Sequence, residues 1–190
     1  RLLDIIDVWL DKNLKREVCE IKKHIIIIGV SKVGRIISSI LKKHDINYLV
    51  LDNNHRVVRL EKTNGYNIYY GDAKNLDILK YIGADKAESV IIANDDDIAC
   101  MQITRFIHEN FPNTVVITKS ESINNADRFK KIGATMVVSK NLETALQLSH
   151  AALNSVGKST NEIDSALNAF RDASSEALKE VINYNEASKD

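Results

Sequence analysis

The chain has 190 residues, 44% of them hydrophobic and 27% charged, which is typical of a globular protein with a full hydrophobic core. Its 26 basic and 26 acidic residues cancel, so no net positive charge attracts nucleic acid or anionic lipid. The two cysteines form no CxxC pair, which argues against a disulfide framework or a structural zinc site and indicates a reducing compartment. No apolar run approaches the roughly 20 residues of a membrane span, and no secretory signal pattern is present.

The first segment, residues 1–19, has the pattern of an amphipathic helix. Its apolar residues fall near one face, with aspartates on the other. Two interpretations are equally open: the helix packs on its own domain, or it links the domain to an upstream one. Because the chain opens with Arg1, we expect it to be part of a longer protein.

Strand and helix patterns then alternate. In chain order we predict a strand at 24–29, a helix at 33–44, a strand at 47–52, a helix at 55–64 capped by Asn54, a strand at 67–70, a helix at 77–82, a strand at 89–93, a helix at 96–110, a strand at 114–118, a helix at 123–132 and a strand at 136–138. Three helices end at a glycine: Gly65, Gly83 and Gly133. This alternation predicts a Rossmann-like, doubly wound, parallel six-stranded sheet with helical extensions at both ends.

From residue 141 onward only helical patterns remain, at 141–155 and from about 161 to 183. In the second, apolar residues starting at Ile163 follow 4-3 spacing, which fits either a coiled-coil seam or a face docked on the parent domain. We therefore expect three regions: a linker helix at 1–22, a nucleotide-binding domain at 23–140 and a helical dimerisation and tail region at 141–190.

A dinucleotide-binding turn follows the first strand. The G-x-G-x-x-G pattern is met by Gly29, Val30, Ser31, Lys32, Val33 and Gly34, with serine in place of the middle glycine. Gly29 makes the tight turn and Gly34 lets the helix pack close to the strand. A serine hydroxyl in the middle position either donates to a phosphate or narrows the phosphate cradle.

Polar residues end the next strands at the same edge of the sheet. Asp52, followed by Asn53, lies 23 residues after Gly29, close to the spacing of the carboxylate that binds ribose. Its charge opposes a 2′-phosphate and so favours NAD or an adenosine nucleotide over NADP. Asp72, followed by Ala73, is placed for an adenine amino group. Asn94 and Asp95 end the fourth strand. The alternative to ligand binding is that each of these aspartates caps a turn or the start of a helix.

At these residues the sequence resembles the KTN/RCK (TrkA-N) domains that regulate potassium transport. The resemblance rests on H-I-I-I-I-G-V-S-K-V-G-R at 24–35, L-V-L-D at 49–52, Y-Y-G-D-A at 69–73, I-G-A-D-K-A-E at 82–88 and I-I-A-N-D-D at 91–96. The G-D-A after the third strand and the G-A-x-x-A-E before the fourth are the discriminating parts. E-N-F-P-N at 109–113 and N-L-E-T-A at 141–145 are similar to the branch attached to Kef-type potassium efflux antiporters.

The resemblance implies a cytosolic regulatory module that follows the membrane part of an antiporter, on the cytoplasmic side of the cell membrane. It implies NAD(H) or AMP as ligand, a homodimer formed through the later helices, and a flavodoxin-like ancillary oxidoreductase as a partner. Kef-type members also bind glutathione. The run at 117–122 lacks the two arginines of that branch, and Glu121 stands where a cation would pair with a glutathione carboxylate, which argues against glutathione gating.

Catalysis and metal binding are not predicted. After residue 140 only about 50 helical residues remain, without the substrate domain or acid–base group that hydride transfer needs. The histidines have no metal-ligand spacing, and the carboxylates of residues 95–97 start a helix and point in different directions. A ligand-sensing regulatory domain is favoured over two alternatives: the cofactor half of an NAD-dependent oxidoreductase, and a pseudo-Rossmann domain without nucleotide.

Overall fold

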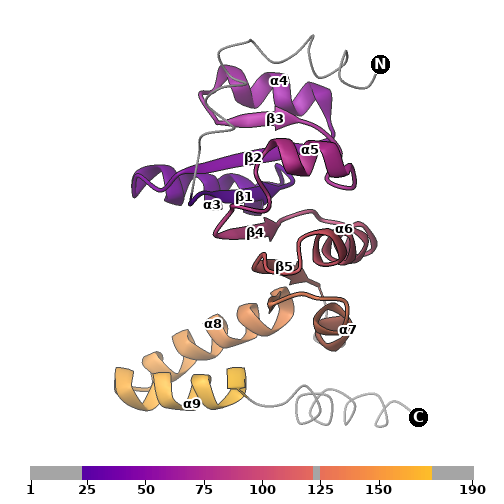
Figure 1. Ribbon diagram of the computed structural model, residues 1–190. Coiled ribbons are helices and arrows are strands. Elements are labelled where there is room, and N and C mark those ends of the chain that lie inside the picture. The colour runs from indigo at the N-terminus through magenta and orange to yellow at the C-terminus, as the bar shows by residue number, and fades with distance from the viewer. Residues whose placement is uncertain (1–22, 122–124, 173–190) are drawn as a thin grey trace, which may run out of the picture.

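The computed structural model describes residues 23–121 and 125–172, in which six parallel strands alternate with helices (Figure 1). In chain order the elements are β1 (Ile25–Ile28), α3 (Lys32–Lys43), β2 (Tyr48–Asp52), α4 (His55–Thr63), β3 (Ile68–Tyr70), α5 (Leu76–Tyr81), β4 (Ser89–Ile92), α6 (Asp97–Asn110), β5 (Val116–Ser120), α7 (Ala126–Lys131), β6 (Met136–Ser139), α8 (Lys140–Ser155) and α9 (Thr160–Asp172). The strand order is β3-β2-β1-β4-β5-β6, with every pair parallel. The predicted Rossmann-like, doubly wound sheet is confirmed.

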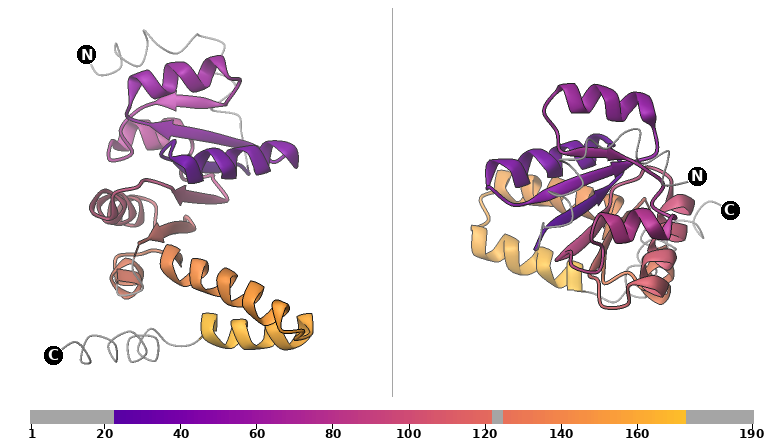
Figure 2. Two further views of the ribbon diagram at one scale, coloured as in Figure 1. Left: turned by 180° about the vertical axis from the view of Figure 1, so that it is seen from behind. Right: turned by 45° about the horizontal axis from the view of Figure 1, so that its top comes forward.

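Helices cover both faces of this sheet, and each face has its own core. On one face, Ile26, Leu49 and Val90 pack with Leu79 of α5, Ile107 of α6 and Phe129 of α7. On the other, Ile27 and Val50 pack with Val58 of α4 and with Ile37 and Leu41 of α3. Figures 1 and 2 show α5, α6 and α7 stacked along one side of the sheet. The near-continuous apolar runs of β1 and β2 follow from this burial on both faces.

Most helices begin at a polar side chain that caps free backbone amides. Asn54 accepts from the amides of Arg56 and Val57, which confirms its predicted role, and Asn75 does the same for α5. Ser31, Asp96 and Ser139 cap α3, α6 and α8. The caps fix where each helix starts at the edge of the sheet.

Element boundaries differ from the prediction mainly at β5. The strand begins at Val116, two residues later than expected, and extends to Ser120 because its end pairs with β6 through Ser120 and Ser139. Thr114 lies before the strand and donates its hydroxyl to the carbonyl of Ala84. The predicted helix at 1–19, the start of the helix at 123–132 and the end of the helix at 161–183 lie outside the described residues.

Helices α8 and α9 form an antiparallel pair that projects from the β6 end of the sheet (Figures 1 and 2). Leu146 is the buried residue of α8 and Ile163 that of α9, whereas Leu148, Val156 and Phe170 are 68%, 75% and 51% exposed. No helix in the described part of the chain combines the length and apolar sequence required to cross a membrane.

An ion pair between a half-exposed arginine and a buried glutamate joins α3 to α4, and breaking it should destabilise the fold. The Arg35 guanidinium lies 2.8 Å from the carboxylate of Glu61, which is 5% exposed. Glu61→Gln should lower the free energy of unfolding by about 2 kcal/mol, because a charge-assisted bond is lost beside a half-exposed arginine. As the control, Glu121→Gln breaks an exposed pair with Lys140 and should cost about 0.5 kcal/mol or less. Equal losses in urea unfolding of the two variants would contradict this ranking.

Candidate functional site

All the predicted site residues lie at or just after the carboxyl ends of four neighbouring strands, β3, β2, β1 and β4. Residues 29–31 connect β1 to α3, and residues 32–34 form the first turn of α3. Asp52 is the last residue of β2 and Asn53 follows it. Asp72 and Ala73 follow β3, and Asn94 and Asp95 follow β4. In open α/β sheets ligands bind in the crevice outside this edge, where the strand order reverses between β1 and β4.

The turn between β1 and α3 depends on close backbone approach at its two glycines. Gly29 has a φ of +97°, and a Cβ there would lie 3.1 Å from the amide nitrogen of Asn94. A Cβ on Gly34 would overlap the carbonyl oxygen of Gly29. The two glycines therefore bring the first turn of α3 against the end of β1.

Ser31, at the position of the missing middle glycine, turns its side chain toward the sheet. Its hydroxyl donates to the carbonyl oxygen of Ala93 at 2.6 Å and accepts from the amide of Gly34 at 3.3 Å. Its φ of −73° is open to any residue, so the serine carries no backbone strain. The single hydroxyl proton is used on Ala93, which leaves phosphate contact in this turn to the backbone.

Three backbone amides at the start of α3 remain for a ligand. The Val30 amide donates to Asp52, and those of Gly34 and Arg35 bond to Ser31. Among the described residues, no acceptor pairs with the amides of Ser31, Lys32 and Val33. Lys32 is exposed beside them. Free amides at a helix N-terminus, with the helix dipole behind them, attract an anion.

Asp52 ties the end of β2 to this turn. One carboxylate oxygen accepts from the Val30 amide and the other from the Asn54 amide, both at 2.7 Å. The carboxylate is half-buried, and Asn53 beside it is exposed. Asp52 thus stands next to the free amides of this turn, at the position predicted for a ribose-binding carboxylate.

The turn after β3 presents a second carboxylate. Asp72 is exposed, and one of its oxygens accepts from the Lys74 amide at 2.9 Å. Ala73 is buried, and a Cβ on Gly71 would lie 3.0 Å from side-chain carbons of Leu51 and Ile78. In the G-D-A sequence, Gly71 and Ala73 therefore pack closely against the core, while the carboxylate of Asp72 between them is exposed.

The carboxylates after β4 each have a different protein partner. Asp95 pairs with Lys119 of β5 at 2.6 Å, Asp96 caps α6, and Asp97 accepts from Ser120 and Asn125. No group of three potential metal ligands occurs in the described ranges. The Lys119 contact links β4 to β5, and no local sequence spacing points to it.

Below this turn, Cys100 has a structural environment. Burial, reinforced by the charge of Asp97, raises the pKa of its thiol to about 11. The protonated thiol lies 3.4 Å from the carbonyl oxygen of Asn94, to which it donates. The side-chain oxygen of Asn94 accepts a hydrogen bond from the Asp96 amide. The turn after β4 is therefore fixed by bonds to both the backbone and the side chain of Asn94.

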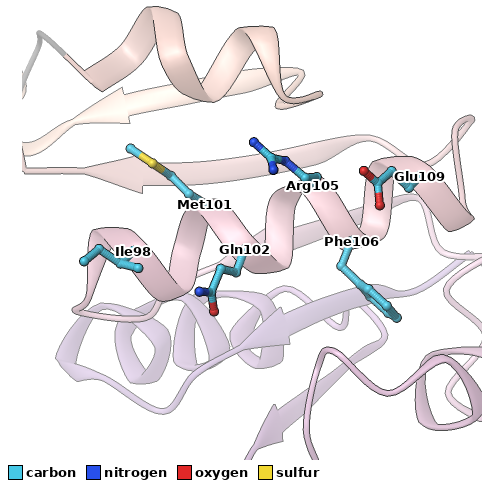
Figure 3. Close-up of a pocket in the computed structure, with 6 residues that line it drawn as sticks. All are labelled: Ile98, Met101, Gln102, Arg105, Phe106 and Glu109. Carbon is cyan, nitrogen blue, oxygen red and sulfur yellow. The ribbon is translucent and has the colours of Figure 1, made fainter.

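A hollow of about 280 Å³ lies elsewhere, along the outer side of α6. Figure 3 shows that its six lining residues all come from this helix, with Met101 and Arg105 on the side opposite Gln102 and Phe106. None of the predicted ligand-binding residues lines it. The hollow is therefore separate from the candidate site.

The role of Ser31 is open to a direct test. Ser31→Gly removes the bond to Ala93 and should lower the free energy of unfolding by about 1 kcal/mol without raising nucleotide affinity, because the hydroxyl does not obstruct the cradle. Calorimetric titration with AMP and urea unfolding measure the two effects. A variant that binds AMP more tightly than the native chain would show that the serine narrows the cradle.

Known proteins resemble this chain in sequence. Residues 25–140 match the family model of the TrkA-N domain. The chain is 32% identical over 175 residues to K(+) efflux antiporter 2, chloroplastic, from Arabidopsis thaliana, covering 92% of this chain but only 15% of that relative.

Two solved structures share the fold. The Kef C-terminal domain of Shewanella denitrificans in an AMP-bound form aligns with a TM-score of 0.67 at 22% identity, over 84% of this chain and 97% of that one. The GsuK channel bound to NAD aligns with a TM-score of 0.62 at 21% identity, over 68% of this chain and 23% of that one.

Proposed function

The chain belongs to the TrkA-N domain family, and from this premise we propose that it is the ligand-sensing regulatory domain of a potassium efflux antiporter. In this role it binds an adenine nucleotide, NAD(H) or AMP, at the carboxyl edge of the sheet and thereby gates transport. The proposed location is the cytoplasmic face of the membrane, on a chain that carries the antiporter.

The observation that carries the proposal is the arrangement of the turn at 29–34 with Asp52. Three free amides at the start of α3 offer a phosphate site, and a carboxylate bonded to the same turn offers a ribose site. Asp72 is available for the base. AMP in the Kef domain and NAD in the GsuK channel are ligands of this chemistry in proteins of the same fold.

A regulatory role is proposed over catalysis because binding at this edge can shift a conformational equilibrium without any chemical step. The carboxylates after β4 are bonded to other residues of the protein: Asp95 forms an ion pair with Lys119, and Asp97 accepts a hydrogen bond from Ser120. They serve as supports for the turn rather than as an acid–base pair beside a substrate.

The binding experiment is a thermal-shift series with AMP, ADP, NAD, NADH and NADPH. At a ligand concentration near 100 Kd, binding adds about 2.7 kcal/mol of stability. We expect stabilisation by the adenine nucleotides and NAD(H), and less by NADPH, whose 2′-phosphate faces Asp52. No shift with any nucleotide would mean that the chain is a Rossmann domain without nucleotide.

Homodimerisation through α8 and α9 is the second part of the proposal. Leu148, Val156 and Phe170 expose apolar surface on this projecting pair, as expected of helices that bury it in an assembly. The flavodoxin-like oxidoreductase stays a prediction of the family resemblance.

The dimer is tested with Leu148→Glu combined with Phe170→Glu, which should convert a dimer into a monomer in light scattering. Leu60→Glu, at a residue 58% exposed on α4, is the matched control and should leave the mass unchanged. A monomeric native chain, or a double variant that stays dimeric, would contradict the proposed interface.

A further inference from the structure

Two aromatic rings meet at the carboxyl ends of β2 and β3. His55 is the first residue of α4, and Tyr70 is the last residue of β3. Their ring centroids lie 5.7 Å apart with the planes at 75°, an edge-to-face arrangement. Tyr70 is nevertheless 48% exposed, so about half of its surface is available for contact with a ligand.

The sheet register places Tyr70 directly beside the proposed ribose carboxylate. Tyr70 is the partner of Asp52 between β3 and β2, as Ile68 is of Val50. Paired residues on neighbouring strands point to the same face, and the strands lie about 4.8 Å apart. Ile68 and Val50 belong to the core under α3 and α4, which puts Tyr70 and Asp52 on that same face.

The order of the strands then fixes where a base would lie. The phosphate amides start α3 after β1, on one side of Asp52, and β3 borders β2 on the other side (Figure 1). A nucleotide with its phosphate at α3 and its ribose at Asp52 directs its base away from the phosphate. The base therefore extends toward β3, where Tyr70 is the residue next to Asp52.

We infer that Tyr70, held by His55, is the wall that the base of the nucleotide contacts in this site. The inference rests on the proposed function above. The open part of the Tyr70 ring supplies an apolar surface for an aromatic base, and His55 fixes the ring by its edge contact. Asp72, two residues after Tyr70, is placed to accept a hydrogen bond from an amino group at the rim of the base.

If Tyr70 contacts the base, its substitution should change the affinity only for ligands that have a base. Stacking on an aromatic side chain favours any ligand that has a base and has no effect on a ligand that lacks one. AMP and ribose 5-phosphate share the phosphate and the ribose and differ in the base. Their affinity ratio therefore isolates the contribution of the wall from that of Asp52 and the α3 amides.

The test is isothermal titration calorimetry of the native chain and of Tyr70→Ala, Tyr70→Leu and Tyr70→Phe with both ligands. Tyr70→Ala and Tyr70→Leu should lower AMP affinity about tenfold and leave ribose 5-phosphate affinity unchanged, whereas Tyr70→Phe keeps the ring and the AMP affinity. Tyr70→Leu keeps an apolar side chain in contact with His55, so it should fold even if Tyr70→Ala does not. Circular dichroism checks that each variant is folded.

The outcomes separate the two proposals. If the native chain binds AMP and the alanine and leucine variants bind it equally well, the base wall is wrong and the proposed function stands. If both ligands lose affinity in parallel, Tyr70 supports the turn rather than the base, and the inference is again wrong. If the native chain binds NADH but not AMP, the same variants are compared with NADH, and unchanged NADH affinity in the alanine and leucine variants overturns the inference. A native chain that binds neither AMP nor NAD(H) overturns the proposed function and the inference together.

Discussion

Replacing Gly34 by alanine should lower the free energy of unfolding by about 3 kcal/mol and abolish nucleotide binding. A Cβ at this position overlaps the carbonyl oxygen of Gly29, which is backbone and cannot rotate away. Relief requires α3 to move off the end of β1, and the amides of Ser31 and Lys32 move with it. The same displacement that removes packing therefore also disrupts the phosphate site.

Gly71→Ala is the matched control. The atoms nearest to its added Cβ are methyl carbons of the Ile78 and Leu51 side chains at 3.0–3.1 Å, and these can shift by a few tenths of an ångström. We expect a loss of about 1 kcal/mol and retained AMP binding. Urea unfolding and calorimetric titration of both variants give the comparison. A Gly34→Ala protein as stable as Gly71→Ala would contradict the rigid contact.

The fold could be predicted from the sequence because local signals agreed with one another. Alternating strand and helix patterns and glycine helix ends specify a doubly wound sheet, and right-handed crossovers limit its strand order. The β5 boundary was missed because it depends on pairing of Ser120 with Ser139, a contact between strands that local pattern does not contain.

The candidate site was predictable in position but not in its contacts. The spacing of Gly29, Gly34 and Asp52 placed these residues at one edge, and the structure brings them together. The direction of the Ser31 hydroxyl could not be predicted, because its acceptor on Ala93 lies 62 residues away.

Some residues could not be identified from the sequence because their contacts are with residues far away in the chain. Tyr70 and His55 have no motif in common and meet only because β3 lies beside β2. His24, unremarkable as the residue before β1, is fully buried, with its Nε2 2.9 Å from the carbonyl oxygen of Ile82. In each case the partner is set by topology rather than by spacing along the chain.

Replacing Asp52 by alanine should cost about 2 kcal/mol of stability even without nucleotide. The carboxylate accepts hydrogen bonds from two backbone amides, each at 2.7 Å. Without it, the amide of the half-buried Val30 would lose its partner. Asp52→Asn should fall in between, because its single carbonyl oxygen can accept only one of the two amides well. Asp72→Ala is the control: that carboxylate is exposed and accepts one amide, so its loss should cost under about 1 kcal/mol.

Ligand discrimination separates this structural role of Asp52 from its proposed role in binding ribose. If the carboxylate accepts the ribose hydroxyls, the native chain should bind AMP about tenfold or more tightly than 2′,3′-dideoxy-AMP, and Asp52→Ala should bind the two alike. Asp52→Asn should also narrow the preference for NADH over NADPH, since the charge opposing the 2′-phosphate is gone. A variant that loses stability but keeps both preferences would show that Asp52 only braces the turn, and the ribose would have to be held by Asn53 or by backbone at the end of β2.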